Sequence, residues 1–439
     1  PGRLTVPEVV QAIAGFADRR LGKGIILAKD TPNFIANRIG TFSMVNLIRV
    51  MREDGLTIEE VDALTGPASG MPRSGTFRLL DLVGLDTAVH VIGNIYQNAP
   101  DDERRDFYRV PPFMEEMLKR NWIGDKAGQG FYKKVKKGGG ESEILALDLD
   151  TLDYRPQRKA SFPSLEMARN VDDPAERLRL LVNADDRAGR FAWKTLSEVL
   201  VYAANRVPEI SDRLVEIDRS MKWGFAWELG LFEMWDALGV AATVARLEKE
   251  GRAAPENVRR MLGAGAASFY RRQDGRAGYF DFGAGSYQEL EPPAGILVLA
   301  DEKDRSRLIR KNAGASLVDL GDGACCVEFH SKMNAIGPDI VAMIQAGLEE
   351  TARNFQALVI ANQGANFSVG ANLMLALMVI QEDDWDEIDL AVRRFQQANM
   401  AVKYSPRPVV VAPFGMTLGG GCEIPLHAAR IRAHAELYM

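Results

Sequence analysis

The sequence has few of the residues that bind metals or form disulfides. Its 439 residues include three cysteines and four histidines, and two of the cysteines, Cys325 and Cys326, are adjacent. Adjacent cysteines cannot bridge each other without strain, and no cysteine or histidine spacing is typical of a metal site. We therefore expect no metal, no disulfide framework and a reducing, cytoplasmic location.

A basic excess and a long apolar run are also missing. The net charge is −6 at pH 7, whereas a nucleic-acid partner favours a basic face. No apolar run approaches the roughly 18 residues of a membrane span. Neither a nucleic acid nor a membrane is therefore an expected partner. The first residues show neither a signal pattern nor an initiator Met, so we expect the sequence to start inside a longer protein.

What the sequence does contain is an internal repeat. The stretch Gly75 to Gly84 and the stretch Gly230 to Gly239 share the pattern Gly-x-Phe-x-x-x-Asp-x-x-Gly, displaced by 230 − 75 = 155 residues. An apolar-Asp pair precedes each copy, ending in Asp62 and in Asp218. Glycines allow a sharp turn or a close approach, and the Asp can cap a helix or tie a loop. We interpret the motif as a packing device within a repeated helical unit.

The first half of the sequence shows mainly helical periodicity. A long helix is predicted to open after Thr31 and to stop at Gly55. Thr57-Ile-Glu-Glu60 has the form of a capping box, in which the hydroxyl and the carboxylate each satisfy a free backbone N–H. The other predicted helices are 4–20, 57–65, 86–97, 111–122, 174–182 and 191–207, and the run 24–29 is predicted as a short strand.

Three motifs in the first copy carry a family resemblance. They are Pro32-Asn-Phe-Ile-Ala-Asn37-Arg38-Ile39, then Gly75 to Asp86, then Lys126 to Tyr132. In this order and spacing they resemble the C-terminal helical domain of the 3-hydroxyacyl-CoA dehydrogenases. The resemblance implies that Asn37 lies near the reacting acyl group and orients it, which an amide can do without titrating. An Asn that only ties its own helix is the alternative.

The same resemblance has implications for the cofactor and the oligomer. In that family NAD and a catalytic His-Glu pair belong to a preceding Rossmann domain, and this sequence has no strand-Gly-x-Gly-x-x-Gly-helix unit at its start. We therefore expect the NAD site to lie outside this chain. Two tandem copies resemble the multifunctional fatty-acid oxidation proteins, whereas single-activity dehydrogenases usually carry one copy and pair as dimers.

Strand patterns replace helical ones in the last third of the sequence. Runs at 295–300, 315–320, 325–329 and 357–361 are predicted strands, and the amphipathic stretch 338–355 is a predicted helix between the last two. A strand, a helix and a second strand in this order predict a β-α-β unit.

Three sequence motifs in this last segment resemble those of the enoyl-CoA hydratases of the crotonase family. They are Met333-Asn334-Ala335, Asn366 to Asn372, and Gly415 to Glu423 with its triple glycine. The resemblance implies an oxyanion hole, in which the N–H groups of Ala371 and Gly420 bind the thioester oxygen, and a proton-transferring Glu423. It also implies a place near the substrate for Asn334, Ala335 and Gly370. Such paired donors stabilise an enolate by roughly 3–4 kcal/mol per donor.

Two departures from the crotonase pattern stand out. A second catalytic glutamate would lie about twenty residues beyond Glu423, past the last residue, Met439, and the usual Asp after the first donor is Asn372. His427 lies one helical turn beyond Glu423, which would let it reach the carboxylate, but a core or surface histidine is the favoured interpretation. His330, beside Ser331, has no acid at an informative spacing and is not predicted to activate a nucleophile.

These patterns predict a mainly α fold followed by a truncated α/β crotonase-like segment. The expected parts are a first helical domain (1–140), a linker (141–180), a second helical domain (181–292) and the start of a crotonase domain (293–439). We expect a fragment, itself inactive, of a β-oxidation enzyme with NAD-dependent L-3-hydroxyacyl-CoA dehydrogenase and enoyl-CoA hydratase activities. The expected partners are acyl-CoA and either a second copy of the chain or a thiolase subunit. The alternatives are a non-catalytic scaffold that binds acyl-CoA or associates with a partner subunit, and a crotonase-type enoyl-CoA isomerase.

Overall fold

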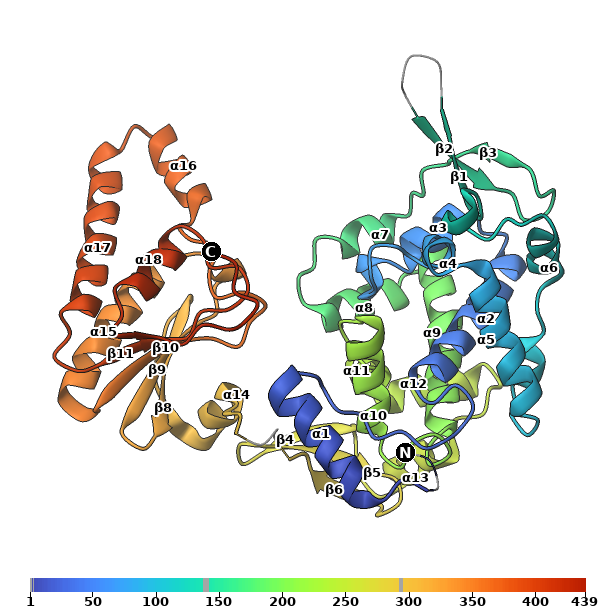
Figure 1. Ribbon diagram of the computed structural model, residues 1–439, viewed down its shortest axis with the longest axis horizontal. Coiled ribbons are helices and arrows are strands. Elements are labelled where there is room, and N and C mark those ends of the chain that lie inside the picture. The colour runs from blue at the N-terminus through green and yellow to red at the C-terminus, as the bar shows by residue number, and fades with distance from the viewer. Residues whose placement is uncertain (1, 3, 137–141, 292–294) are drawn as a thin grey trace. The chain divides into compact units, whose positions relative to one another are not determined.

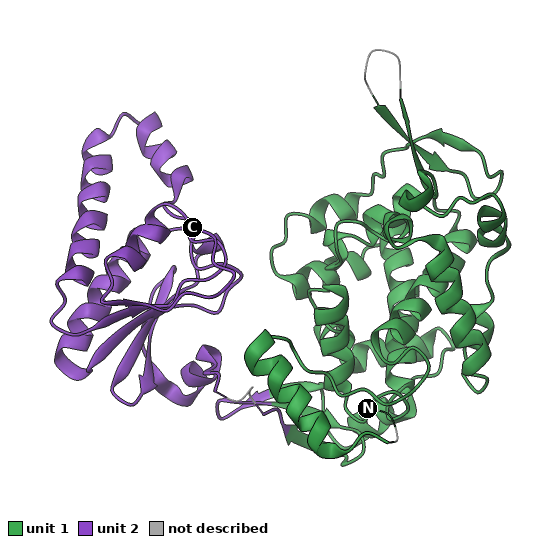
Figure 2. Ribbon diagram, viewed as in Figure 1, with its two compact units in different colours: residues 1–271, 278–288 green, residues 272–277, 289–439 purple. Residues whose placement is uncertain are grey.

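The computed structural model describes residues 2, 4–136, 142–291 and 295–439 and divides the chain into two compact units (Figures 1 and 2). Unit 1 comprises residues 1–271 and 278–288, and unit 2 comprises residues 272–277 and 289–439. The expected boundaries at 140–141 and at 292–293 lie outside the described residues.

The first copy in unit 1 is a set of helices followed by a small sheet. Its longest helix is α2, and its three strands form an antiparallel sheet of order β1-β2-β3. The elements are α1 (Pro7–Leu21), α2 (Ala36–Asp54), α3 (Ile58–Leu64), η1 (Pro67–Ser69), α4 (Phe77–Val83), α5 (Leu85–Asn98), η2 (Arg105–Tyr108), α6 (Pro112–Lys119), η3 (Asp125–Ala127), β1 (Tyr132–Lys136), β2 (Ser142–Leu147) and β3 (Tyr154–Pro156).

The second copy repeats this order. Its longest helix, α9, is 19 residues long, as α2 is, and packs against α2. A sheet of order β4-β5-β6 again follows the helices (Figure 1). The elements are α7 (Pro163–Ala168), α8 (Pro174–Val182), α9 (Arg187–Asn205), α10 (Leu214–Arg219), the π-helix η4 (Ser220–Gly224), α11 (Leu231–Leu238), α12 (Val240–Lys249), α13 (Glu256–Gly263), β4 (Tyr270–Gln273), β5 (Arg276–Asp281) and β6 (Ser286–Glu289).

The aspartate before each motif ties three elements together in the same way in both copies. Asp62 accepts hydrogen bonds from the N–H groups of Phe77 and Arg78, at 2.6 and 3.1 Å, and from the hydroxyl of Tyr132 at 2.7 Å. Asp218 accepts the equivalent three bonds, at 2.9, 3.1 and 2.9 Å. These bonds confirm that each Asp is a polar tie between the end of one helix, the start of the next and a strand.

The aspartate inside each motif makes a second tie. Asp81 accepts the N–H groups of Phe131 and Tyr132, both at 2.8 Å, and Asp236 accepts those at 269 and 270, at 2.7 and 2.9 Å. A Cβ on Gly75 would lie 2.7 Å from the backbone of Asp62, so only glycine allows this approach. The repeat is therefore a packing motif in which carboxylates accept hydrogen bonds from backbone N–H groups.

Two segments of unit 1 differ from expectation. Residues 141–180 were expected to be a linker, but within the described part they form β2, β3, α7 and most of α8, all assigned to unit 1. Leu147 and Leu165 of this segment are buried, so packing overrides its polar composition. The run 24–29 forms no strand, because no neighbouring strand pairs with it.

Unit 2 is a six-stranded sheet of order β12-β11-β10-β9-β8-β7 with helices beside it. The pairs β9–β10, β10–β11 and β11–β12 are parallel, and β7–β8 and β8–β9 are antiparallel. The elements are α14 (Leu299–Glu302), η5 (Lys303–Arg307), β7 (Leu308–Lys311), β8 (Ala315–Gly321), β9 (Ala324–Phe329), η6 (Lys332–Asn334), α15 (Pro338–Asn354), β10 (Ala357–Ala361), α16 (Leu373–Gln381), α17 (Trp385–Lys403), β11 (Val409–Val411), α18 (Gly420–Leu426) and β12 (Arg430–Ile431).

The predicted β-α-β unit is confirmed as β9, α15 and β10, and its core lies between the sheet and α15. Val327 of β9 and Leu358 of β10 pack with Ile344 of α15 in one buried cluster. The predicted strand at 295–300 is wrong, because the end of this apolar run opens the short helix α14 instead.

No helix in the described ranges is by itself long and apolar enough to span a membrane. The helices α4 and α5 meet the length and composition criteria only as a pair, and a bend of 97° separates them.

Candidate functional site

Two backbone N–H groups at one end of the sheet in unit 2 have no acceptor among the described residues. They are those of Ala371, after β10, and Gly420, the first residue of α18. A first helical residue has no acceptor within its own helix. The neighbours of Ala371 are both bonded: the carbonyl of Gly370 accepts the N–H of Ile336 at 2.7 Å, and the N–H of Asn372 donates back to Ile336 at 3.0 Å.

Glycine brings these two donors close together. A Cβ on Gly370 would lie 2.7 Å from the carbonyl oxygen of Leu418 and 3.3 Å from the nitrogen of Gly420, so a larger residue would force the two segments apart. Gly370 also has φ +91°, which L side chains rarely adopt. The arrangement is a pair of fixed donors with free N–H groups.

Ser368 joins the segments that carry both donors. Its side chain is fully buried and donates to the carbonyl oxygen of Asn334 at 2.7 Å, and the same hydroxyl accepts the N–H of Gly370 at 3.1 Å. Its carbonyl oxygen accepts the N–H of Leu418 at 2.9 Å. Sequence analysis did not single out Ser368, although it lies inside the motif Asn366 to Asn372.

Asn334 and Ala335 frame the site without exposing a free amide. The side chain of Asn334 is buried and donates to the carbonyl oxygen of Asn366 at 2.9 Å, while Ala335 donates its N–H to Lys332 at 3.2 Å. Asn334 therefore holds the turn in place, and a direct substrate contact by either residue is still a prediction.

Glu423 lies in the first turn of α18, three residues beyond Gly420, and its side chain is exposed. One carboxylate oxygen accepts the amide of the buried Asn399, from α17, at 3.4 Å. His427 does not reach this carboxylate, because its Nδ1 is 2.7 Å from the backbone carbonyl oxygen of Glu423. Asn399 was missed from sequence because nothing in a helical pattern distinguishes an inward amide from an outward one.

A helix with unburied apolar side chains follows Ala371 directly. No residue of α16 is buried, and Leu373 and Met374 are 76% and 64% exposed. Asn372 is the N-cap of this helix, since its side chain accepts the N–H of Leu375 at 3.2 Å. An Asn at this position therefore keeps the capping function that the carboxylate of an Asp would also supply.

In unit 1, Asn37 is the second residue of α2, and its side chain is exposed. Among the described residues its amide makes no hydrogen bond, so it does not tie its own helix in this structure. The neighbouring Arg38, in contrast, is fully buried. Asn37 is thus an available amide on a firmly anchored helix.

The remaining histidine and metal candidates give no site. His330 contacts Ser316 at 2.9 Å rather than Ser331, and the side chain of Ser316 is buried. The described ranges contain no group of three or more His, Cys, Asp or Glu side chains placed to hold a metal ion.

The comparisons with known proteins agree with the motifs of unit 1. Residues 34–134 match the family model of the 3-hydroxyacyl-CoA dehydrogenase C-terminal domain, which supports the resemblance of the first copy. A Bacillus subtilis protein named "Probable 3-hydroxyacyl-CoA dehydrogenase" is 48% identical over 439 residues, which are 100% of this chain and 55% of that protein. A Rickettsia felis protein named as a trifunctional enzyme of the fatty acid oxidation complex is 27% identical over 98% of this chain and 55% of its own length.

The chain therefore spans about half the length of the curated relatives it matches. Among solved structures, an enoyl-CoA hydratase from Bacillus anthracis is similar to part of the chain, with 21% identity over 28% of this chain and 48% of that one, and a TM-score of 0.26.

Proposed function

We propose that the protein acts on acyl-CoA thioesters and that unit 2 carries an enoyl-CoA hydratase site. The observation that supports this most strongly is the pair of free N–H groups of Ala371 and Gly420, held close together around Gly370. Two fixed donors suit an oxygen on which negative charge develops, because they need no reorganisation when the charge appears.

In the proposed reaction the thioester oxygen accepts both N–H groups. Glu423 takes a proton from water as the water oxygen bonds to the β-carbon, and the electron pair of the double bond moves through the α-carbon onto the thioester oxygen. Glu423 then gives the proton it took from the water to the α-carbon of the enolate, which restores the carbonyl and returns Glu423 to its carboxylate form. The exposed apolar residues of α16 begin two positions after Ala371 and suit the acyl chain.

For unit 1 we propose the acyl-CoA-lining part of an L-3-hydroxyacyl-CoA dehydrogenase. The match of residues 34–134 supports this role, and Asn37 is the amide that would orient the 3-hydroxyl or 3-keto oxygen. NAD is the cofactor that this activity implies. In the described part of unit 1 no helix lies between the strands of either three-stranded sheet, so these residues form no β-α-β nucleotide cradle and none is assigned to NAD.

The test of the hydratase site separates binding from proton transfer. Acetoacetyl-CoA forms an enolate that absorbs in the near ultraviolet, so two donors at its thioester oxygen should increase the enolate absorbance on binding. Hydration of crotonyl-CoA is followed separately, as the loss of the conjugated thioester absorbance. Glu423→Gln should keep the enolate signal and lower hydration by about 10²-fold or more. Glu349→Gln, an exposed carboxylate on α15, is the matched control and should change neither.

The outcomes distinguish the alternative functions. Absence of an enolate signal in the wild-type protein would indicate a scaffold without an oxyanion site. A normal enolate signal with no hydration, but with movement of the double bond in a 3-enoyl-CoA, would indicate an isomerase. An unchanged rate of hydration in Glu423→Gln would show that Glu423 does not transfer the proton. The proposed role of the two N–H donors would not be affected by that result.

A further inference from the structure

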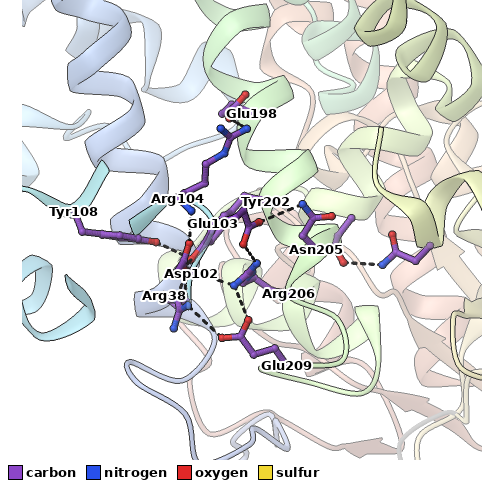
Figure 3. A network of polar contacts seen from close by, with 12 residues as sticks. Arg38, Asp102, Glu103, Arg104, Tyr108, Glu198, Tyr202, Asn205, Arg206 and Glu209 are labelled. Atoms are coloured by element: carbon purple, nitrogen blue, oxygen red, sulfur yellow. Dashed lines mark hydrogen bonds and ion pairs between the residues drawn. The ribbon is translucent and has the colours of Figure 1, made fainter. Parts of the chain in front are cut away.

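The residue that follows Asn37 is a fully buried arginine whose partners come from both copies. Arg38 donates from Nη2 to Asp102, in the turn after α5, at 2.6 Å and from Nε to the hydroxyl of Tyr202, on α9 of the second copy, at 2.7 Å. Tyr202 in turn donates to Asp102 at 2.6 Å, which closes a triangle (Figure 3). Arg38 and Tyr202 are 164 residues apart in the chain.

This cluster is ionised although it is buried. Burial opposes the charge of Asp102, but the hydroxyl of Tyr202 and the cations of Arg206 and Arg38 outweigh it and hold the pKa of Asp102 below its usual range. Tyr108 donates to the hydroxyl of Tyr202 at 2.8 Å and completes that group's hydrogen bonds. A buried charge pair has a fixed geometry, because breaking it leaves an unpaired charge in a site without water.

The turn before Asn37 is held in a strained conformation. Asn33 and Phe34 have φ values of +63° and +51°, which are uncommon for residues other than glycine. The side chain of Asn33 donates to the carbonyl oxygen of Val91 at 3.2 Å and accepts from Asn94 at 2.6 Å, both on α5. Such a strained conformation persists only where the surrounding residues determine it.

The second copy also packs against the first turns of α2. Gly40 lies against the ring of Phe225, so closely that a Cβ on it would be 2.1 Å from the ring, and a Cβ on Gly224 would be 3.7 Å from that of Ala36. Gly224 ends the π-helix η4, a rare conformation that is frequent at functional sites. The first turns of α2 are thus fixed by α5, by α9 and by η4.

We infer that the second copy positions Asn37, and that Tyr202 is the positioning residue through which it acts. Tyr202 orients Arg38, and Arg38 fixes the first turn of α2, on which the adjacent Asn37 presents its amide. The inference rests on the proposed orienting role of Asn37 in the dehydrogenase. It explains why a helix with an exposed functional amide carries a buried cation as the next residue.

The experiment is a double-mutant cycle of Asn37→Ala and Tyr202→Phe in the enzyme at its full encoded length, read as kcat and KM for NAD-linked oxidation of L-3-hydroxybutyryl-CoA. Tyr202→Phe keeps the ring that stacks on Phe42 and removes only the hydroxyl. Each single variant should lower kcat/KM by roughly tenfold to a hundredfold, because misplacement of an orienting group has effects of this size. The double variant should be no worse than Asn37→Ala.

A merely structural Tyr202 would give a different pattern, in which the two factors multiply. That result, or an unchanged kcat/KM in Tyr202→Phe beside an impaired Asn37→Ala, would overturn the inference and leave the role of Asn37 intact. An unchanged kcat/KM in Asn37→Ala would instead overturn the proposed role of Asn37 and, with it, the inference.

Two further variants keep the test decisive. Tyr270→Phe removes a different buried hydroxyl of the second copy, the one bonded to Asp218, and should leave kcat/KM unchanged. If Tyr202→Phe does not fold, Tyr108→Phe replaces it, because it removes only the donor to Tyr202. Its expected effect is smaller, of the same sign, and again absent on the Asn37→Ala background.

Discussion

The two helical copies share their internal bonds and differ in what they present. Both use one aspartate to tie helix to helix and another to tie helix to strand. The first copy begins its long helix with Ala36-Asn37-Arg38, whereas the second begins with Arg187-Ala188-Gly189, so its second position carries no amide. A Cβ on Gly189, at the position of Arg38, would lie 2.0 Å from the carbonyl oxygen of Ala184, so no side chain fits there. The repeat thus duplicates the scaffold and not the amide.

The copies also differ in the charge of the residue next to the aspartate that precedes each motif. Burial raises the pKa of Asp62 to about 6. Burial together with the negative charge of Glu233 raises the pKa of Asp218 to about 8. The residue at the position of Glu233 in the first copy is Arg78, a cation. Deeper burial and the nearby negative charge of Glu233 therefore give the second copy a carboxylate that binds its proton more tightly.

The strongest test of the shared scaffold is to truncate the same buried side chain in each copy. Phe77 and Phe232 are buried and pack on Phe131 and Phe269, with ring centroids 4.8 and 4.9 Å apart. Phe77→Ala and Phe232→Ala should each lower the free energy of unfolding by about 3–5 kcal/mol. Urea unfolding followed by tryptophan fluorescence reports mainly on unit 1, which holds five of the six tryptophans.

A matched control lies on the same helix as Phe77. Leu82 is half exposed, and Leu82→Ala should change the free energy of unfolding by less than about 0.5 kcal/mol. Equal losses for the two Phe variants would support equivalent cores. A much smaller loss for Phe232→Ala would show that the second copy has a looser core than the first.

The sequence predicted most helices and the β-α-β unit because their apolar positions repeat at regular spacing. Periodicity placed both ends of α2, α5 and α15 within five residues of where they lie. The repeat also predicted the aspartate ties, since a polar residue at a fixed offset between glycines needs a local partner. The sheet β1-β2-β3 was missed because a strand such as Tyr132–Lys136 carries three lysines, a composition that indicates a solvent-exposed loop.

Contacts between distant segments could not be predicted in the same way. The pairing of Arg38 with Tyr202 depends on how α2 packs against α9, and no sequence pattern records which residues then meet. At the site in unit 2, the family resemblance indicated Ala371, Gly420 and Glu423, and the roles of these residues stay predictions. The part of Ser368 in holding the donors became visible only through its three hydrogen bonds.

A smaller effect should separate the copies at their shared turn glycines. Gly84 and Gly239 have φ values of +102° and +84°, so Ala at either position should cost about 1–3 kcal/mol in backbone strain. A Cβ on Gly84 would in addition lie 2.5 Å from the carboxylate of Asp86 and 2.6 Å from Lys126, whereas a Cβ on Gly239 meets only Ala242, at 3.7 Å. Gly84→Ala should therefore be the more destabilising variant in thermal unfolding. Equal losses would show that Asp86 and Lys126 move aside freely.

The pH dependence of stability should distinguish the two buried carboxylates. A raised folded-state pKa stabilises the fold in its protonated form, so this contribution is complete below about pH 4 and is lost as the pH rises. For Asp62 the loss ends near pH 6, and for Asp218 it continues to about pH 8. Between pH 6 and 8 the wild-type chain should therefore lose stability because Asp218 ionises.

Glu233→Gln tests the cause of that difference. It removes the negative charge, although the amide oxygen can still accept the N–H of Gly230. The pKa of Asp218 should fall, and each unit of that fall lowers the cost of ionising Asp218 in the folded state by about 1.4 kcal/mol. Urea unfolding at pH 6, 7 and 8 should then show a flatter profile than the wild type. An unchanged profile would assign the raised pKa to burial alone, and Arg78→Gln in the first copy serves as the matched variant.

The smallest expected effect concerns the helix before each motif. Thr57 caps α3, accepting the N–H of Glu60 at 3.3 Å, while the carboxylate of Glu60 accepts the N–H of Thr57 at 2.8 Å. The equivalent helix α10 starts at Leu214, and its N-cap residue, Arg213, makes no side-chain cap hydrogen bond. Thr57→Ala should lower the free energy of unfolding by about 1 kcal/mol, and Thr57→Ser, which keeps the hydroxyl, by less. If Thr57→Ala leaves the free energy of unfolding unchanged, the cap is not needed to start α3. Burial of the apolar face would then be enough to start α3, as it must be for α10, and both helices would begin for the same reason.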